Sequence, residues 1–344
     1  MTPAQMKAVV YSAPSQFSVR EEPVPRPAKG QILIKVSCVG VCGSDGHIHA
    51  GEFPVLYPLI PGHEVMGTVH SIGEGVDGYM IGDRCVVEPV AFCGQCFFCR
   101  RGNHVMCLNL GGHGVTFPGG FAEYMLTEAS RVFKIKNLTD EEAVLIEPTS
   151  CALHAIDRLK VKVGAEALVI GAGPSGMMLA QLLKLNGASK VVVVAPAGRK
   201  MEVARRLEAG DEYVELDRSD SRAGWAKVKR EYPRGFDVVV EMTGSEAIIN
   251  DAINYVRRGG SLMIYSLYPP SALVHWPPSK IFADEIEILG SMAQAYCFPR
   301  AVEYIESRKV KTQGVVTDIF KLDEWEKVLE KMESRDFVKI AVKV

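Results

Sequence analysis

The sequence predicts an α/β protein with two domains, a β-rich domain and a doubly wound parallel sheet. Three observations lead to this fold class. The chain has 344 residues, which exceeds what one ordinary core needs and is enough for two. Short apolar runs broken by Gly and Pro fill its first part. From Ala167 on, β-rich runs alternate with helical patterns, which is typical of a parallel sheet with crossover helices.

The β-rich part shows closely spaced strands, as in a small barrel or sandwich. Its expected strands are Lys7–Tyr11, Ile32–Val41, Val65–Ile72, Arg84–Pro89 and Phe121–Leu126. The pattern then becomes helical. Thr139 with Glu142 has the form of a capping box, and Pro148–Leu159 continues as a second helical stretch.

The alternating part carries five expected strands and intervening helices. The strands are Ala167–Ile170, Lys190–Val194, Tyr213–Leu216, Phe236–Glu241 and Ser261–Tyr265, and the helical patterns include Gly176–Leu185 and Arg199–Leu207. After a further apolar run at Ile286–Gly290 come two amphipathic helices, Pro299–Ser307 and Asp323–Ser334, and a last strand, Lys339–Val344. We expect this tail to fold back on the first domain.

Composition excludes several classes of protein. Apolar residues make up 47% and charged residues 23%, with 39 basic against 41 acidic side chains, so neither disorder nor a nucleic-acid partner is expected. No stretch approaches the roughly 18 apolar residues of a membrane span, and no secretion signal begins the chain. A cytoplasmic protein is expected. Its nine cysteines therefore indicate metal ligation rather than disulfides.

A glycine motif marks a dinucleotide site. Gly171, Gly173 and Gly176 form G-x-G-x-x-G directly after an expected strand and at the start of an expected helix, with Pro174 and Ser175 between them. Glycines permit the tight turn, and the helix N-terminus offers N–H groups to a pyrophosphate. A lone motif of this kind is often only a glycine-rich turn, but the βα units around it favour nucleotide binding.

The second strand of this unit indicates the type of nucleotide. An NAD-binding strand ends in an acidic residue for the adenosine ribose, whereas this one ends at Ala195. Arg199 and Lys200 follow, where a ribose 2′-phosphate would lie. The sequence therefore predicts NADP as cofactor, with NAD as the other option. Alternatively, the two cations are only the solvated first turn of a helix.

Two further strand ends are candidates for the nicotinamide half. Thr243 with Gly244 follows the fourth strand, and Ser266 with Leu267 follows the fifth. Bound cofactor is expected at the carboxyl ends of strands in an open α/β sheet. Plain turn residues are the competing interpretation.

Four cysteines in one loop predict a structural zinc site. Cys93, Cys96, Cys99 and Cys107 are spaced closely enough to surround one ion. Four thiolates complete a tetrahedral shell around Zn²⁺ and leave no open position. Chance clustering or a redox pair would explain the spacing less well.

A second group of ligand types is dispersed. Cys42, His63, Glu64 and Glu147 together offer sulfur, imidazole and carboxylate, a set that suits a catalytic Zn²⁺ with an open position. Each residue alone is weak evidence. Cys42 would by itself be a buried apolar filler, His63 a core histidine and Glu147 a helix cap.

These motifs together resemble the zinc-containing medium-chain dehydrogenase/reductases over essentially the whole chain. The resemblance rests on the Gly62-His-Glu segment with Gly67, Gly73 and Val76, the four-cysteine loop and the glycine motif, in that order. The Cys42-Gly-Ser-Asp and Leu145-Ile-Glu-Pro segments are most similar to the polyol dehydrogenase branch. The resemblance implies a GroES-like catalytic domain of residues 1–150 completed by 290–344, and a Rossmann domain of residues 151–289.

The same resemblance implies roles for single residues. Cys42, His63 and Glu64 would ligate zinc, and Glu147 would be a fourth ligand or would hold a zinc-bound water. Ser44 and His47 would pass the alcohol proton toward solvent. Asp45 would orient the ligating histidine.

The function expected is oxidation of a polyol, a pentitol such as arabinitol, to its ketose with NADP. Rival hypotheses are a dehydrogenase of a simple secondary alcohol or threonine, and a protein that keeps the fold without catalysis. Sorbitol-type enzymes carry an arginine just after the strand equivalent to 286–290, whereas this chain reads Gly290-Ser-Met-Ala-Gln294. We expect Gln294 or Tyr296 to contact the substrate instead. The resemblance also implies a homodimer or homotetramer.

Overall fold

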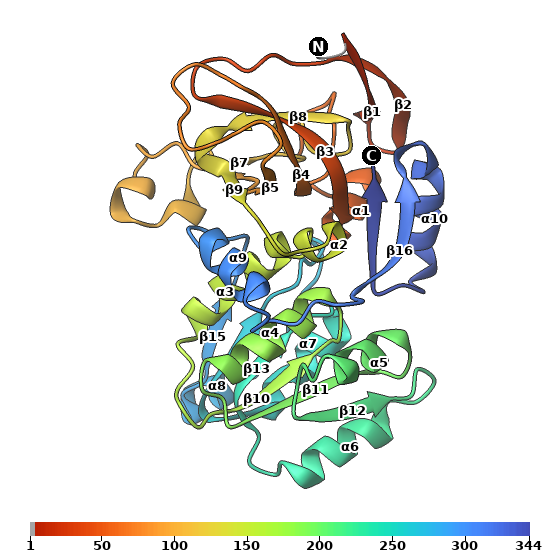
Figure 1. Cartoon of the computed structure of the whole chain (residues 1–344). Coiled ribbons are helices and arrows are strands. Elements are labelled where there is room, and N and C mark those ends of the chain that lie inside the picture. The colour runs from red at the N-terminus through yellow and green to blue at the C-terminus, as the bar shows by residue number, and fades with distance from the viewer. Residues whose placement is uncertain (1–3) are drawn as a thin grey trace. The chain divides into compact units, whose positions relative to one another are not determined.

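The computed structural model describes residues 4–344, which form two compact units. One unit comprises the described residues up to Ser150 together with Gln294–Val344, and the other comprises Cys151–Ala293. Figure 1 shows both, with the C-terminal strands and helix of the first unit in blue. In the part of the chain described, no helix is long and apolar enough to cross a membrane.

The first unit is built on a seven-stranded sheet that combines five strands from residues 31–134 with two strands near the C-terminus. The strand order is β16-β17-β3-β4-β5-β9, and β8 also pairs with β3. The bounds are β3 Gln31–Val41, β4 Glu64–Ile72, β5 Arg84–Val87, β8 Tyr124–Glu128, β9 Val132–Lys134, β16 Val316–Lys321 and β17 Lys339–Lys343. Two small sheets accompany it, β1 Gln5–Ala13 with β2 Gln16–Pro23, and β6 Val90–Ala91 with β7 Gly111–Gly112.

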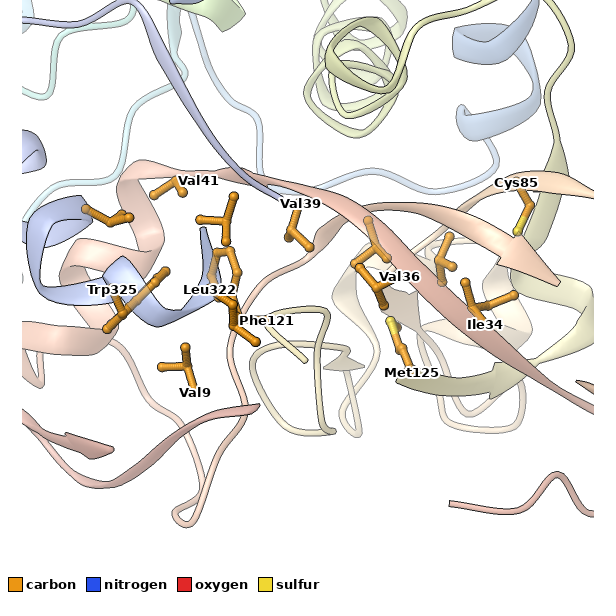
Figure 2. Close-up of a cluster of buried hydrophobic side chains, with 14 of the residues drawn as sticks. Val9, Ile34, Val36, Val39, Val41, Cys85, Phe121, Met125, Leu322 and Trp325 are labelled. Carbon is orange, nitrogen blue, oxygen red and sulfur yellow. The ribbon is translucent and has the colours of Figure 1, made fainter. Parts of the chain in front are cut away.

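The core of this unit joins residues that are far apart in the sequence. Val39 of β3 and Phe121 lie in one buried cluster with Leu322 and Trp325 from the C-terminal segment (Figure 2). The rings of Phe121 and Trp325 are 4.5 Å apart between centroids. Burial of such large apolar side chains is the main favourable contribution to folding, so this cluster anchors β17 beside β3.

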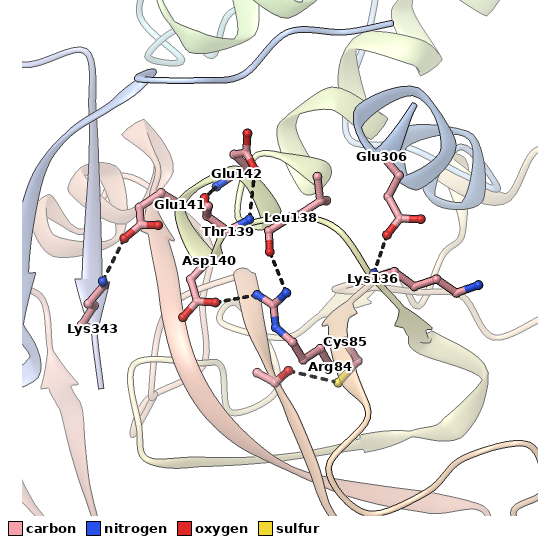
Figure 3. Close-up of polar contacts among 11 residues, drawn as sticks. Arg84, Cys85, Lys136, Leu138, Thr139, Asp140, Glu141, Glu142, Glu306 and Lys343 are labelled. Atoms are coloured by element: carbon pink, nitrogen blue, oxygen red, sulfur yellow. Dashed lines mark hydrogen bonds and ion pairs between the residues drawn. The ribbon is translucent and has the colours of Figure 1, made fainter. Parts of the chain in front are cut away.

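Short helices complete the first unit. They are α1 Gly43–Ala50, α2 Asp140–Ala143, α9 Phe298–Glu306 and α10 Trp325–Ser334, together with the start of α3 Ile146–Leu159. The expected capping box is present at α2, where the Glu142 amide donates to Thr139 Oγ1 and the Thr139 amide donates to Glu142 Oε2 (Figure 3). Arg84 ties this turn to the sheet through Asp140 and the Leu138 carbonyl. These contacts hold the entrance to α3, the helix that carries Glu147.

The second unit is a six-stranded parallel sheet in the order β12-β11-β10-β13-β14-β15. Its strands are β10 Glu166–Ile170, β11 Lys190–Pro196, β12 Glu212–Leu216, β13 Phe236–Glu241, β14 Val256–Ile264 and β15 Glu287–Gly290. Its helices are α4 Pro174–Leu185, α5 Arg199–Arg206, α6 Arg222–Glu231, α7 Glu246–Ala252 and α8 Pro278–Asp284, and they pack against the strands (Figure 1). The strand order reverses between β10 and β13, where nucleotides bind in this architecture.

The fold class predicted from the sequence, a GroES-like domain with a Rossmann-type parallel sheet, is confirmed. The elements not expected from the sequence include β2, β16 and α1. Two of the eight residues of helix α1 are glycines. Only two of its residues are buried, Asp45 and Ile48. It therefore lacks the apolar periodicity by which a helix is recognised in a sequence.

Candidate metal centre and cofactor site

Three of the dispersed residues meet in the first unit. Cys42 lies between β3 and α1, His63 directly precedes β4, and Glu64 is the first residue of that strand. One candidate ligand atom of each residue lies within 4.8 Å of the other two. The antiparallel register of β3 and β4 brings them together, because Gly40 and Glu64 are paired residues. His63 and Glu64 are buried.

Asp45 connects two of these residues from helix α1. Its Oδ2 accepts a hydrogen bond of 2.8 Å from the Cys42 amide. Its Oδ1 lies 3.9 Å from His63 Nδ1, and both of these buried atoms are without a hydrogen-bond partner among the described residues. Oδ1 is thus the acceptor facing Nδ1, which leaves Nε2 of His63 for a metal. The structure places Asp45 beside His63, and its orienting role stays a prediction.

Glu64 has one partner that the sequence analysis did not identify. Lys339 Nζ, from β17, lies 2.6 Å from both carboxylate oxygens, but only the contact with Oε1 has hydrogen-bond geometry. Both side chains are buried, 5% and 1% exposed. Oε2 is buried without a hydrogen bond, although the Lys339 ammonium lies 2.6 Å from it, so this oxygen keeps lone pairs that a metal ion can take. The residues present therefore fit a metal ion.

The charges around the cluster favour a cation as well. Burial lowers the pKa of His63, but Cys42, Asp45 and Glu147 outweigh it, so that pKa lies well above the ordinary value. Glu147 is buried and close enough to act on His63 by its charge, although it lies outside the three-residue cluster. The groups that favour a proton on His63 would also favour a metal cation, and Zn²⁺ would have to displace that proton in order to bind.

The expected proton-transfer residues both lie on α1. Ser44 Oγ is 3.5 Å from His63 Nε2, so the hydroxyl lies beside the metal cluster. His47, near the other end of the helix, is 2.7 Å from Glu52 through Nδ1 and is a third exposed. His49 is not an isolated surface residue, because its Nδ1 lies 3.0 Å from the hydroxyl of the buried Tyr11.

The four cysteines of the loop also come together, at a separate place in the first unit. All four sulfur atoms lie within 4.8 Å of one another. Cys107 Sγ is 3.5 Å from Cys93 Sγ and 3.9 Å from Cys96 Sγ. Sulfurs that surround zinc at about 2.3 Å are separated by about 3.8 Å, whereas a disulfide needs about 2.05 Å. The spacing fits a closed tetrahedral thiolate site.

Backbone amides further stabilise thiolates in this loop. The amides of Cys99 and Leu108 lower the pKa of Cys96 to about 6, whereas burial and the neighbouring thiols raise the pKa of Cys99 to about 12. The amides of Cys93 and Asn109 approach Cys107 Sγ at 3.3 Å. Because the thiolate is the form that binds metal, these contacts prepare the loop for Zn²⁺.

In the second unit each of the three motif glycines is suited to its position for a different structural reason. Gly171 has φ 121°, a backbone conformation that favours glycine. Gly173 precedes α4 and has open space where a side chain would be, and Pro174 is the first residue of the helix. A Cβ on Gly176 would lie 2.2 Å from the Gly171 carbonyl oxygen. Turn, open approach and close packing are the features of a pyrophosphate-binding loop.

The residues that would select the nucleotide lie after β11. Ala195 is buried near the end of the strand, Gly198 has φ 128°, and α5 begins at Arg199. Arg199 is exposed and Lys200 is partly exposed. At the other side of the switch point, a Cβ on Gly244 would lie 3.0 Å from the Leu267 carbonyl oxygen and 3.7 Å from Ser266 Cβ. The two strand ends named for the nicotinamide half are therefore neighbours.

Thr243 is held by a buried carboxylate that the sequence analysis did not consider. Glu241, the last residue of β13, accepts hydrogen bonds from the Thr243 amide and hydroxyl and from the Tyr268 hydroxyl. The carboxylate thus fixes the loop after β13.

One substrate expectation is wrong. Gln294 is fully buried, its amide nitrogen donates 2.6 Å to Glu88, and its oxygen accepts from the Cys297 amide. The side chain is thus engaged inside the first unit, and it has no exposed surface for a substrate to contact. Tyr296 is 64% exposed and makes an edge-to-face contact with His104, with the ring planes 85° apart.

Comparisons with known proteins agree with this architecture. Residues 28–137 match the family "Alcohol dehydrogenase GroES-like domain", and residues 174–307 match the family "Zinc-binding dehydrogenase". The chain is 54% identical over 341 residues to D-arabinitol dehydrogenase 1 of Uromyces fabae, covering 99% of this chain and 98% of that one.

Two solved structures are similar over nearly the whole chain. A candidate zinc-binding dehydrogenase of Sinorhizobium meliloti bound to NADP superposes with a TM-score of 0.93 at 29% identity, covering 99% of this chain and 100% of that one. A short chain alcohol dehydrogenase of Escherichia coli complexed with NADH gives 0.89 at 26% identity, with the same coverage.

The chain therefore belongs to the zinc-containing medium-chain dehydrogenase/reductases, in the polyol dehydrogenase branch. It is an oxidoreductase of the alcohol dehydrogenase type.

Proposed function

We propose that this protein oxidises a polyol, a pentitol such as arabinitol, to the corresponding ketose with NADP, at a zinc ion held by Cys42, His63 and Glu64. One observation carries the proposal. Three ligand types from two separate segments converge within 4.8 Å, and Glu64 keeps a buried oxygen without a hydrogen bond. The identity to a D-arabinitol dehydrogenase supports the pentitol.

The roles of the chain's own residues follow from their positions. Zinc, when bound, supplies a Lewis acid that lowers the pKa of a coordinated alcohol. Ser44, beside His63 Nε2, would take the hydroxyl proton, and the partly exposed His47 would exchange it with solvent. Glu147 lies outside the three-residue cluster, which favours contact with a metal-bound water over direct ligation. The alcohol carbon then gives its hydride to the nicotinamide, yielding ketose, NADPH and one proton.

A substrate panel tests the reaction. We expect arabinitol and related pentitols to give a much higher kcat/KM than isopropanol or threonine. Rapid oxidation of isopropanol or threonine with no reaction of polyols would reject the polyol assignment. No turnover of any alcohol by zinc-loaded protein would favour a protein that keeps the fold without catalysis.

The preference for NADP rests on the absence of an acidic residue at Ala195 and on the cations Arg199 and Lys200. A 2′-phosphate would be repelled by a carboxylate at the strand end and attracted by the two cations. We expect Ala195→Asp combined with Arg199→Ala to move the ratio of kcat/KM values toward NAD. Arg205→Ala is the matched control, because Arg205 lies on the same helix but pairs with Glu215. An unchanged ratio in the double variant would mean that the basic pair does not select the cofactor.

A homodimer or homotetramer is the proposed assembly, and the catalytic domain is proposed to include the tail. Strand β15 is an edge of the parallel sheet, and its Ile288 is 37% exposed. An exposed apolar edge strand is a common site of strand pairing between subunits. Light scattering of the purified protein, and of Ile288→Lys, tests this: a monomeric wild type would contradict it.

A further inference from the structure

The side chains of Lys339 and Glu64 come from two strands that flank β3, and they meet over Gly40 of that middle strand. In the order β17-β3-β4, Gly40 of β3 is paired with Glu64 on one side and with Ala341 on the other. Lys339 is the first residue of β17, two positions before Ala341. Because Gly40 has no side chain, the ammonium group of Lys339 reaches across β3 to the Glu64 carboxylate.

The space around this carboxylate is closely defined. A Cβ on Gly40 would lie 1.9 Å from Glu64 Oε2, a distance that real Cβ contacts essentially never show, and 3.0 Å from Cδ, which is tighter than most. Lys339 Nζ donates to Oε1 at 2.6 Å and lies 2.6 Å from Oε2 as well, and both side chains are shielded from water. The Glu64 carboxylate is thus confined on one side by the backbone of Gly40 and on another by the buried ammonium group of Lys339.

We propose that Lys339 is a positioning residue that makes Glu64 bind the metal through a single oxygen, and so keeps a coordination position for the alcohol. The proposal rests on the zinc site proposed above and adds a reason why that site stays open. It concerns the orientation of the ligand rather than its identity.

The reason is one of coordination number. A carboxylate binds a metal through one oxygen or through both. Catalytic zinc sites have three protein ligands and leave the fourth position to water or substrate. If Glu64 bound with both oxygens, together with Cys42 and His63 it would occupy four positions. Lys339 opposes this because its ammonium group lies 2.6 Å from both oxygens and donates its hydrogen bond to Oε1, at a buried position where water does not compete.

Cobalt substitution tests the proposal by spectroscopy. Co²⁺ is titrated into protein whose four-cysteine site already holds zinc, and visible absorption reports the geometry, since four-coordinate cobalt absorbs more strongly than five-coordinate cobalt. For the wild type we expect a four-coordinate spectrum that changes when a polyol is added. For Lys339→Met we expect a weaker, five-coordinate spectrum that no longer responds to the polyol, with cobalt still bound. Lys339→Arg should restore the wild-type spectrum.

Lys343→Met is the matched control. Lys343 lies on the same strand and pairs with Glu141 at 2.8 Å, at a half-exposed position away from the cluster (Figure 3). The cobalt spectrum of Lys343→Met should equal that of the wild type. If Lys339→Met instead lost cobalt affinity by about 10- to 100-fold, Lys339 would merely support the site and the proposal would be overturned.

Gly40→Ala keeps the proposal testable if Lys339→Met does not fold. The added Cβ would push the carboxylate away while Lys339 is still present, so we expect cobalt binding to weaken. Wild-type affinity and spectrum in Gly40→Ala would show that Glu64 is not held in this way. A five-coordinate spectrum in the wild type would also overturn the inference while leaving the dehydrogenase function intact. Failure of cobalt to bind at all would overturn the proposed zinc site itself.

Discussion

The two cysteine-containing clusters of this protein are assembled in opposite ways. The four sulfurs of Cys93, Cys96, Cys99 and Cys107 come from one short loop, in which Cys96 is only partly buried and the ligand type is uniform. The cluster of Cys42, His63 and Glu64 joins segments that are brought together only by the pairing of β3 with β4. The first cluster can form locally, whereas the second requires the folded sheet.

This difference suits the four-cysteine cluster to stabilising the fold and the mixed cluster to catalysis. Four thiolates can satisfy a zinc ion completely, so the loop suits a structural role. The mixed cluster offers fewer ligands and is surrounded by further polar groups, among them Asp45, Glu147 and Lys339. Such surroundings tune a metal that still has to accept a substrate. Substitutions in the two clusters should therefore have different consequences.

The largest effect is expected for Cys42→Ser. Loss of the thiolate should remove the catalytic metal and lower kcat/KM for a polyol at least about a thousandfold, because Lewis-acid stabilisation contributes several kcal/mol to the transition state. The zinc content should fall by one ion per chain. Steady-state kinetics and elemental analysis measure both. Turnover at the wild-type rate would show that the mixed cluster is not the reaction centre.

Cys96→Ser should reverse this pattern. One structural zinc ion should be lost and the melting temperature should fall by several degrees, because metal binding contributes to folding. Activity per remaining zinc ion should change less than about tenfold, since the loop does not touch the reacting atoms. Differential scanning calorimetry and metal analysis are the measurements. A loss of activity as large as that of Cys42→Ser would remove the distinction between the clusters.

Asp45→Asn should affect the mixed cluster alone, and less strongly. The substitution removes the charge that faces His63 Nδ1 but keeps an acceptor for the Cys42 amide. We expect the affinity of the catalytic zinc to fall about 10- to 100-fold, the usual effect of losing a partner of a ligating histidine. Chelator competition measures it. Equal weakening at the four-cysteine loop would indicate a general loss of folding instead.

Thr139→Ala sets the baseline for a structural change away from both clusters. The capping contact with the Glu142 amide is lost, which should lower the free energy of unfolding by about 1 kcal/mol. Metal content and kcat should not change. Urea denaturation with parallel assays tests this, and a loss of zinc in this variant would mean that α2 is coupled to a metal site.

Local signals in the sequence were sufficient for much of the fold. The capping box at Thr139, the strand at Phe236–Glu241 and the glycine motif depend on residues close in sequence, and the structure contains each. The four-cysteine cluster is likewise local. Cys42, His63 and Glu64 were recognised through a family resemblance, since no spacing rule connects residues whose proximity depends on strand pairing.

The partners of Glu64 could not be predicted in that way. Lys339 lies 275 positions beyond Glu64, and nothing in a terminal strand marks one lysine as buried. Gly40 is one glycine among 32, and its role depends on the side chain of the neighbouring strand. Gln294 was misjudged for the same reason, because its partners Glu88 and the Cys297 amide are visible only in the folded chain.

Reconstitution of the mixed cluster tests the account most directly. Chelator-treated protein that retains zinc in the four-cysteine loop is titrated with zinc, and polyol oxidation is followed against metal bound. Activity should return in proportion to the added zinc in the wild type and should not return in Cys42→Ser. Full activity in protein shown by elemental analysis to hold no metal at Cys42, His63 and Glu64 would contradict the proposed chemistry.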